Sequence, residues 1–337
     1  MSRTLVTGAT GFTGQHLVRR LLDEGEDVRI IARQAERARA LFGQSVDIVV
    51  GDVADAAVAR DAVRGCGLVY HLAAAYREAG LPARRYWEVH VESTRLLLEA
   101  SHKEGVSRFV HCSTVGVLGH ISRPPADEMS LHNPGDIYQE TKSQGERLAL
   151  DFHARHGLPL TVARPTAIYG PGDLRLLKLF RMIARRRFAM IGSGEVFYHM
   201  VHVTDLVAGL RLLATQSGAV GEVFILGGGE YRSLNAIAAL VAKTVGVPPP
   251  RWHVPAWPIQ AAASACERLC APFGIEPPIY RRRVDFFTKS RAFSIEKARR
   301  MLGYAPQVDL ETGFRTTTAW YREHGYLPSP RAPGAQP

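Results

Sequence analysis

Short apolar runs alternate with amphipathic stretches over the first 170 residues, and this alternation predicts strands and helices in turn. The first amphipathic stretch, for example, places Leu17, Leu21 and Leu22 at helical spacing. Strands that are apolar throughout meet water on neither face, so they predict a parallel sheet covered by helices on both sides. The predicted strands cover residues 4–7, 28–32, 46–50, 68–72, 108–112 and 160–163, and the predicted helices between them end near residues 24, 42, 64, 104 and 156.

The pattern loosens after Arg164-Pro165, where helices are expected near 175–188, 204–215 and 234–245 and a strand at 222–226. Residues 248–258 carry five prolines and predict an extended connector. An Ala-rich segment around 255–272, which includes Trp257 and Ile259, is expected to form a helical lid. The proline-rich end, residues 327–337, is expected to be disordered. The chain is therefore predicted to be α/β, with a doubly wound parallel sheet and a smaller, mixed C-terminal part.

The composition limits the class of protein. With 46% hydrophobic and 22% charged residues, the chain is an ordinary globular protein rather than a disordered, coiled-coil or collagen-like one. No apolar run reaches the ~20 residues that a membrane span needs, and the N-terminal strand is too short for a secretory signal, so a cytoplasmic location is expected. The four cysteines lack the spacing of a metal site and are too few for a disulfide scaffold.

The charge balance favours anionic partners, because 42 basic residues face 32 acidic ones and leave a net charge of +10. A phosphorylated cofactor and a nucleic acid both satisfy that preference. The short Arg clusters at 84–85, 185–187 and 281–283 are scattered and lack interleaved aromatic residues. They indicate solvated faces and helix ends rather than a nucleic-acid interface.

Three glycines, Gly8, Gly11 and Gly14, follow the first strand and open the first helix. Glycines at this place allow a tight turn, a close approach of the backbone to a pyrophosphate, and close packing of the helix. The helix N-terminus then offers free N–H groups and a partial positive charge to the anion. The sequence therefore predicts a dinucleotide-binding turn.

Two residues at strand ends bear on the choice of dinucleotide. Asp52 ends the third strand, where it would accept a hydrogen bond from an adenine amino group or cap the turn. Arg33 ends the second strand, where proteins that prefer NAD usually carry a carboxylate for the ribose hydroxyls. Arg33 would instead pair with a 2′-phosphate, which favours NADP over NAD.

Tyr138 and Lys142 lie four residues apart on a predicted helix and so share one face. A nearby ammonium, together with the positive nicotinamide of an oxidised cofactor, favours a phenolate that serves as a base. The strand 108–112 runs into Ser113 and Thr114, whose hydroxyls would hold a substrate oxygen near Tyr138 for proton transfer.

These motifs resemble the extended branch of the short-chain dehydrogenase/reductases over residues 3–326. The resemblance implies a nicotinamide cofactor, a Ser/Thr–Tyr–Lys mechanism and a Rossmann-type domain at 1–165 with return segments near 196–228. It places a substrate-binding domain at 166–195 and 229–326. The segments that carry it are Thr7–Gly14, His71–Ala74, Cys112–Gly119, Tyr138–Lys142, Arg164–Pro171 and Leu302–Pro306.

The chain departs from the family pattern at two places. His90 stands where an asparagine usually supports a local polar network; it would be a donor and acceptor there, a titrating group, or a satisfied buried histidine. The catalytic hydroxyl is Thr114 when counted back from Gly119 and Ser113 when counted forward to Tyr138. The cofactor contacts implied overall are Gly8, Thr10, Gly11, Phe12, Thr13, Gly14, Arg33, Asp52, Val53, Leu72, Ala73, Ala74, Tyr138, Lys142, Pro165, Ala167 and Ile168.

Three functions fit the resemblance. One is a 3β-hydroxysteroid dehydrogenase-like reductase on a largely apolar substrate, another a nucleotide-sugar epimerase or dehydratase, and the third a cofactor-sensing binding protein. The presence of both Tyr138 and Lys142 disfavours the third. The resemblance also implies a homodimer through the helices near 84–104 and 137–156.

The substrate region separates the first two functions. Nucleotide-sugar enzymes of this branch usually carry an Arg after a Gly-x-Gly, to hold the diphosphate. Here Phe197 and Tyr198 follow Gly192–Gly194 instead, which suits either an apolar ligand wall or core packing. Arg175, Arg187 and Arg281–Arg283 would hold a diphosphate by another route. The candidate substrate residues are His90, Thr114, Tyr169, Phe197 and Tyr198.

Overall fold

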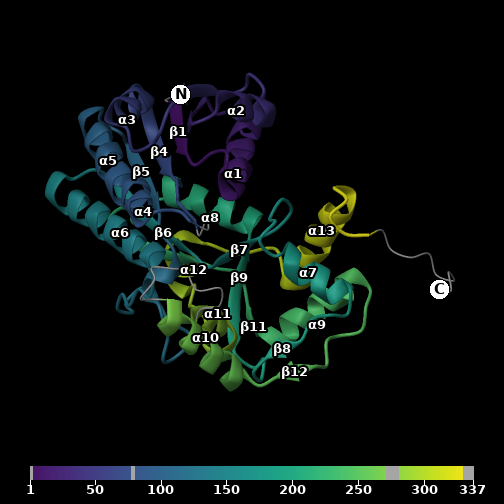
Figure 1. The fold of residues 1–337 in the computed structure, drawn as a ribbon. Coiled ribbons are helices and arrows are strands. Elements are labelled where there is room, and N and C mark those ends of the chain that lie inside the picture. Colours follow the sequence, from purple (N-terminus) through teal and green to yellow (C-terminus); the bar gives the residue numbers. More distant parts are fainter. Residues whose placement is uncertain (1–2, 77–79, 271–280, 329–337) are drawn as a thin grey trace.

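A seven-stranded parallel sheet forms the larger part of the molecule in the computed structural model, which describes residues 3–76, 80–270 and 281–328 (Figure 1). Its strand order is β3-β2-β1-β4-β5-β6-β10, and neighbouring strands are parallel throughout. This order confirms the predicted doubly wound α/β sheet. The strands are β1 (Arg3–Thr7), β2 (Val28–Ala32), β3 (Asp47–Val50), β4 (Cys66–His71), β5 (Arg108–Cys112), β6 (Leu160–Pro165) and β10 (Val223–Leu226).

Successive residues of the strands enter opposite cores, because side chains alternate along a strand. Val6 joins a core under helices α1 and α8, and Leu5 joins a second core under α3, α5 and α6. Both faces of the sheet are therefore covered, which explains why its strands are apolar throughout. The helices of these two layers, with α2 at the edge, are α1 (Phe12–Asp23), α2 (Ala35–Phe42), α3 (Ala56–Val63), α5 (Ser93–Lys103), α6 (Ile137–His156) and α8 (Val203–Thr215).

A smaller part of mixed structure lies beside the carboxyl ends of the strands (Figure 1). Its three-stranded sheet pairs β7 (Ala167–Tyr169) parallel with β9 (Phe197–His202) and β9 antiparallel with β11 (Tyr231–Ser233). Strands β8 (Met190–Ile191) and β12 (His253–Val254) form a separate pair. A third core is built from aromatic side chains of α7 (Leu177–Ala184) and α13 (Leu310–Glu323), together with α9 (Leu234–Val245) and Leu327.

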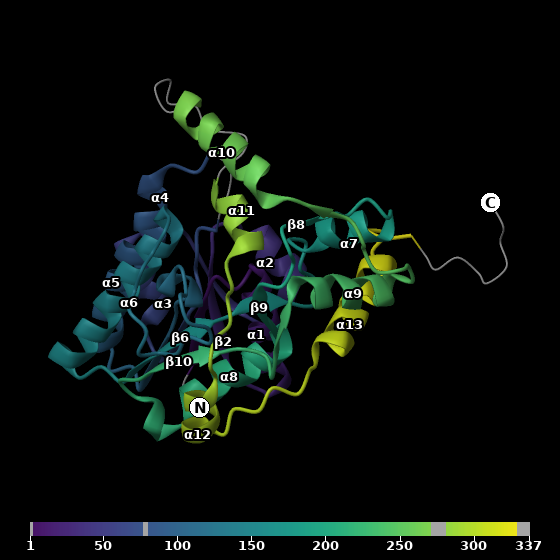
Figure 2. The same ribbon diagram turned by 90° about the horizontal axis from the view of Figure 1, so that it is seen from below.

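Helix α10 (Ala256–Cys270) projects from the body of the molecule and packs beside α11 (Arg281–Thr288) (Figure 2). It begins inside the stretch predicted as an extended connector, since Pro258 lies in its first turn, where proline is tolerated. Trp257 is 72% exposed. A short helix, α12 (Glu296–Leu302), precedes α13. Within the described residues, none of the helices has the length and apolarity to cross a bilayer.

The helix predicted for residues 84–104 contains an irregular turn. It consists of α4 (Ala83–Trp87), a π-helical turn at Glu88–Glu92 and then α5. Gly145 of α6 packs against this turn, and a Cβ on Gly145 would lie 2.3 Å from the carbonyl oxygen of His90. The close contact sets how near α6 approaches the π turn.

A buried ion pair joins α6 to the sheet. Glu146 has a fully buried side chain and accepts hydrogen bonds from Arg164 of β6, with a shortest Nη2–Oε1 distance of 2.5 Å. Ser113 donates to the other carboxylate oxygen at 2.5 Å, and His132 lies 3.3 Å from Oε1. Burial alone would raise the pKa of Glu146, but the hydrogen bonds and the charge of Arg164 outweigh it and lower that pKa to about 2.

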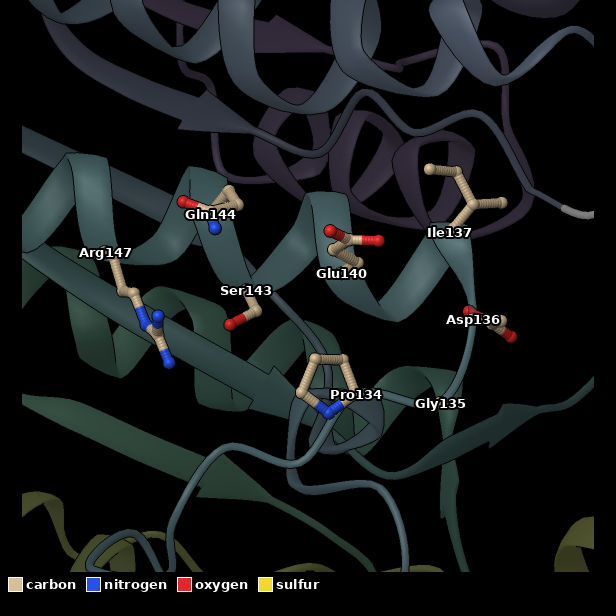
Figure 3. Close-up of a pocket in the computed structure, with 8 residues that line it drawn as sticks. All are labelled: Pro134, Gly135, Asp136, Ile137, Glu140, Ser143, Gln144 and Arg147. Carbon is tan, nitrogen blue, oxygen red and sulfur yellow. The ribbon is translucent and has the colours of Figure 1, made fainter.

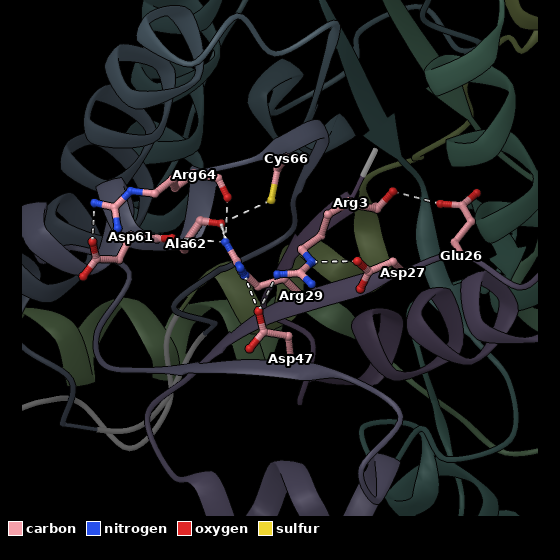
Figure 4. A network of polar contacts seen from close by, with 10 residues as sticks. Arg3, Glu26, Asp27, Arg29, Asp47, Asp61, Ala62, Arg64 and Cys66 are labelled. Atoms are coloured by element: carbon pink, nitrogen blue, oxygen red, sulfur yellow. Dashed lines mark hydrogen bonds and ion pairs between the residues drawn. The ribbon is translucent and has the colours of Figure 1, made fainter. Parts of the chain in front are cut away.

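A second polar network joins the amino ends of β1, β2 and β3, at the edge of the sheet away from the glycine turn (Figure 4). The carboxylate of Asp47 accepts from Arg3 at 2.9 Å and from Arg29 at 2.6 Å, and Arg3 also reaches Asp27 at 2.8 Å. Arg29 donates in addition to backbone carbonyls near the end of α3. Part of the arginine excess thus serves the amino edge of the sheet, away from the glycine turn.

Glu146→Gln tests the buried ion pair, because it keeps the side-chain shape and leaves Arg164 buried without a counter-charge. Removing one partner of such a pair costs about 3–5 kcal/mol of stability. We expect a correspondingly large fall in the midpoint of urea unfolding. The matched control, Glu296→Gln, removes an exposed pair with Arg299 and should cost about 1 kcal/mol or less.

The difference between wild type and Glu146→Gln depends on pH. The folded pKa of Glu146 is about 2 and its ordinary value is 4.5, so the stabilisation is complete above pH 4.5 and is lost as pH falls toward 2. The two midpoints should therefore converge on acidification below pH 4.5. A gap of constant size down to pH 3, or equal effects of the two substitutions at neutral pH, would contradict this account.

Candidate active site

The glycine turn between β1 and α1 forms a cradle that side chains would fill. A Cβ on Gly8, whose φ is +69°, would lie 2.8 Å from the backbone nitrogen of Ala73. A Cβ on Gly14 would lie 2.2 Å from the carbonyl oxygen of Gly8. Gly11 is the N-cap of α1 and offers no side-chain cap, so the N–H groups of the first turn remain free for an anion. These features fit the pyrophosphate of a dinucleotide.

The loop after β4 is held against the glycine turn by hydroxyl and imidazole groups. Thr7 Oγ1 accepts the N–H of Ala73 at 3.2 Å and lies 2.8 Å from Nδ1 of His71. Nε2 of His71 lies 3.1 Å from the hydroxyl of Thr94 on α5. The segment Leu72–Ala74, predicted to line the cofactor, therefore runs beside the turn at a fixed distance.

His90 is a buried, fully hydrogen-bonded residue. Its Nε2 accepts the N–H of Ala75 at 3.0 Å, so the proton resides on Nδ1, which donates to Thr141 Oγ1 at 2.8 Å. Burial and the charge of Lys142 lower the pKa of His90 to about 2, so it stays neutral. The ring is 1% exposed and packs edge-on against Tyr138, with centroids 5.4 Å apart. His90 thus links the loop after β4 to α6 and presents no free nitrogen to a substrate.

The two candidate hydroxyls differ in their contacts. Ser113 is buried and gives its proton to Glu146. Thr114 is the N-cap of the 3₁₀ turn Val115–Leu118, where its oxygen accepts the N–H of Gly116 at 3.0 Å. The hydroxyl proton of Thr114 is not used in that bond and remains available to an acceptor.

Tyr138 and Lys142 lie on the inner face of α6, next to the end of β5. Lys142 donates from Nζ to the carbonyl oxygen of Cys112 at 2.9 Å, which leaves two of its three donors. Burial lowers the pKa of Lys142, and Cys112 and Glu146 act in the opposite direction. The ring of Tyr138 packs edge-on against that of Tyr76, with centroids 5.3 Å apart. Asp136 caps α6 by accepting the N–H of Gln139 at 2.7 Å.

Asp52 and Arg33 lie close together at the carboxyl edge of the sheet. Asp52 accepts the N–H of Ala54 at 3.0 Å and pairs with Arg85 of α4, a partner that the sequence did not indicate. Burial would raise the pKa of Asp52, but the bond from Ala54 and the charge of Arg85 outweigh it and lower the pKa. Arg33 is exposed and forms no hydrogen bond or ion pair with the described residues.

The predicted substrate residues separate into buried and exposed ones. Tyr169 is 1% exposed and packs against Phe314, so its ring belongs to the third core. Phe197 is 40% exposed and packs edge-on against Tyr231, while Tyr198 packs against Phe286 at 5.0 Å. The remaining implied cofactor residues are Thr10, Phe12, Thr13, Val53, Ala167 and Ile168, which are partly buried, and Pro165, which is buried.

A separate pocket lies along the outer side of α6 (Figure 3). It has a volume of about 490 Å³, and its lining includes Glu140, Gln144 and Arg147 with the preceding loop Pro134–Asp136. Neither Tyr138 nor Lys142 lines it. The pocket is thus distinct from the candidate active site.

Of the arginines predicted to hold a diphosphate, Arg187 is exposed just after the end of α7. The side chains of Arg281–Arg283 lie outside the described residues.

The chain matches the model of the NAD dependent epimerase/dehydratase family over residues 4–227. It is 32% identical over 332 residues to sterol demethylase protein B of Methylococcus capsulatus, which covers 96% of this chain and 99% of that protein. It is 30% identical to a 3 beta-hydroxysteroid dehydrogenase/Delta 5→4-isomerase of Mycobacterium tuberculosis, over 95% of this chain and 90% of the relative.

A solved structure resembles the fold over the full length. The crystal structure of DesIV, a dTDP-glucose 4,6-dehydratase from Streptomyces venezuelae with NAD and TYD bound, superposes with a TM-score of 0.76 at 26% identity. The match covers 97% of this chain and 99% of that one. The chain therefore belongs to the NAD-dependent epimerase/dehydratase family, that is, to the extended short-chain dehydrogenase/reductase enzymes.

Proposed function

We propose that this enzyme interconverts an alcohol and a ketone on a largely apolar substrate, with Thr114, Tyr138 and Lys142 as its catalytic residues. The observation that carries the proposal is the bond from Lys142 to the carbonyl of Cys112, because it fixes the inner face of α6 beside the strand end that bears Thr114. A bound nicotinamide supplies or accepts the hydride.

Thr114, Tyr138 and Lys142 each have a separate role in the proposed reaction. Thr114 donates its free proton in a hydrogen bond to the substrate oxygen and so positions it. Tyr138 gives a proton to that oxygen during reduction and takes one from it during oxidation. Lys142 favours the phenolate by its charge and offers its two remaining N–H groups to the nicotinamide ribose.

The substrate class rests on two aromatic pairs in the smaller part of the molecule, Phe197 with Tyr231 and Tyr198 with Phe286. Aromatic pairs built from β9, β11 and α11 stand where sugar-nucleotide enzymes of this branch usually carry an arginine. The relatives named for steroid dehydrogenase and sterol demethylase activities support the same class. A nucleotide-sugar epimerase or dehydratase is the second candidate, favoured by the likeness to DesIV and by the place of Arg175 over the ring of Phe12, beside the glycine turn.

Two measurements test the proposed reaction: net consumption of NADPH and the turnover of the Tyr138→Phe variant. We expect net consumption of NADPH with a carbonyl substrate such as a 3-ketosteroid, whereas an epimerase retains its cofactor without net consumption. Tyr138→Phe should lower the rate by a factor on the order of 10²–10⁴ and leave cofactor affinity nearly unchanged. Lys142→Met should weaken both turnover and cofactor binding. Near-wild-type turnover of Tyr138→Phe would refute the assigned roles.

The choice between NADP and NAD depends on Arg33. We propose that Arg33 pairs with a 2′-phosphate, since it is exposed and free of described partners and β2 ends without a carboxylate. NADPH should bind at least about tenfold tighter than NADH in fluorescence titrations. Arg33→Ala should remove most of that preference, and Arg39→Ala, on the exposed side of α2, should not. Equal dissociation constants in the wild type would exclude the pairing.

We also propose a homodimer through α5 and α6. The outer side of α6 is exposed at Gln144 and Arg147 (Figure 3), and the side chain of Arg95 on α5 is 42% exposed. The long antiparallel contact that two such helices form with their two-fold mates suits a four-helix interface. Light scattering at micromolar concentration should give about twice 37.1 kDa. A monomeric mass would count against the interface.

A further inference from the structure

Arg175 places a guanidinium group between the glycine turn and the catalytic helix. Its Cζ lies 5.5 Å from the ring centroid of Phe12, the first residue of α1, and 5.6 Å from that of Tyr76. The ring of Tyr76 in turn contacts Tyr138. The cation thus stands between the glycine turn, which suits phosphate, and the ring that packs on the proposed proton donor.

Buried neighbours fix this guanidinium in place. Its Nε donates to Asp173 at 2.7 Å and its Nη2 donates to the carbonyl of Ile168 at 2.7 Å. Asp173 is 2% exposed, and its backbone carbonyl accepts the hydroxyl of Tyr321. The Arg175 side chain is still 42% exposed. A cation that is held rigidly yet remains accessible loses little conformational entropy when it meets a ligand.

The segment that carries Arg175 is also docked on α1. The carbonyl of Pro171 lies 3.0 Å from Nε2 of His16, and a Cβ on Gly172 would lie 3.6 Å from the ring of Phe12. Nη1 of Arg175 forms no hydrogen bond with the residues of 3–76, 80–270 and 281–328, so its two N–H groups are available. The guanidinium carbon lies over the ring of Phe12, the first residue of the uncapped turn of α1.

We propose that Arg175 is an anion-binding residue beside the glycine turn, which donates from Nη1 to a phosphate or carboxylate oxygen. Its neighbour Phe12 favours the pyrophosphate of the dinucleotide as the source, and an acidic group on the substrate is the other source of the same chemistry. The proposal rests on the dinucleotide binding stated above and adds to it a residue from the loop between β7 and α7. A guanidinium pairs with such oxygens by charge-assisted hydrogen bonds.

Dissociation constants of Arg175→Met and Arg175→Lys for NADPH, NADH and ADP-ribose test the proposal. We expect Arg175→Met to weaken all three ligands about tenfold or more, because each contains the pyrophosphate, and Arg175→Lys to lose less. Arg185→Met removes an exposed arginine at the end of α7 and should leave every constant unchanged. Arg175→Met deprives the buried Asp173 of its cation and lowers the thermal midpoint, so equal far-UV circular dichroism spectra at the assay temperature show that the variants are folded there.

The outcomes distinguish the two sources. Unchanged cofactor constants with a KM raised only for a substrate that carries a phosphate or carboxylate would assign Arg175 to the substrate anion. Unchanged constants for cofactor and acidic substrate alike would overturn the proposal. If wild type itself binds none of these three pyrophosphate ligands, the proposed function fails instead, and Arg175 is not the reason.

Discussion

The buried ion pair between Glu146 and Arg164 is the constraint on which the candidate active site depends. Two charges that leave water need nearly complete partners to offset the cost of desolvation, and here Ser113 and His132 complete the set. The pair therefore fixes α6 against β6 and, through Ser113, against the end of β5. Lys142 lies one helical turn before Glu146, so the same constraint sets how deep its ammonium reaches.

The sheet and its covering helices were predictable because their signals are local. Continuous apolar runs mark strands buried on both faces, and Leu17, Leu21 and Leu22 mark a helix by spacing alone. The glycine turn and the Tyr138–Lys142 pair were predictable for a similar reason, since each is a short motif whose position relative to a strand or helix is visible in the sequence.

Features that depend on pairing between distant residues were not predictable from one sequence. Nothing local indicates that Arg85 will cover Asp52, or that His132 will join Glu146. Helix α13 was missed because its middle, Thr316 to Thr318, consists of β-branched residues that disfavour helix. Packing decides in its favour, since Leu310, Phe314 and Tyr321 enter the third core. The short strands β7, β9 and β11 are likewise stabilised by the core that they help to close.

The π-helical turn at Glu88–Glu92 sets where His90 lies on the helix and not the register of the helices on either side. A π turn amounts to one extra residue accommodated inside a helix, and it adds almost no net rotation, so α4 and α5 continue in the register of one helix. Deleting one residue between Trp87 and Ser93 would relax the turn to a regular helix and leave Arg85 near Asp52. His90 lies inside the turn and would lose the position from which it accepts the N–H of Ala75. An insertion that the helix as a whole absorbs thus decides the hydrogen bond of a single residue.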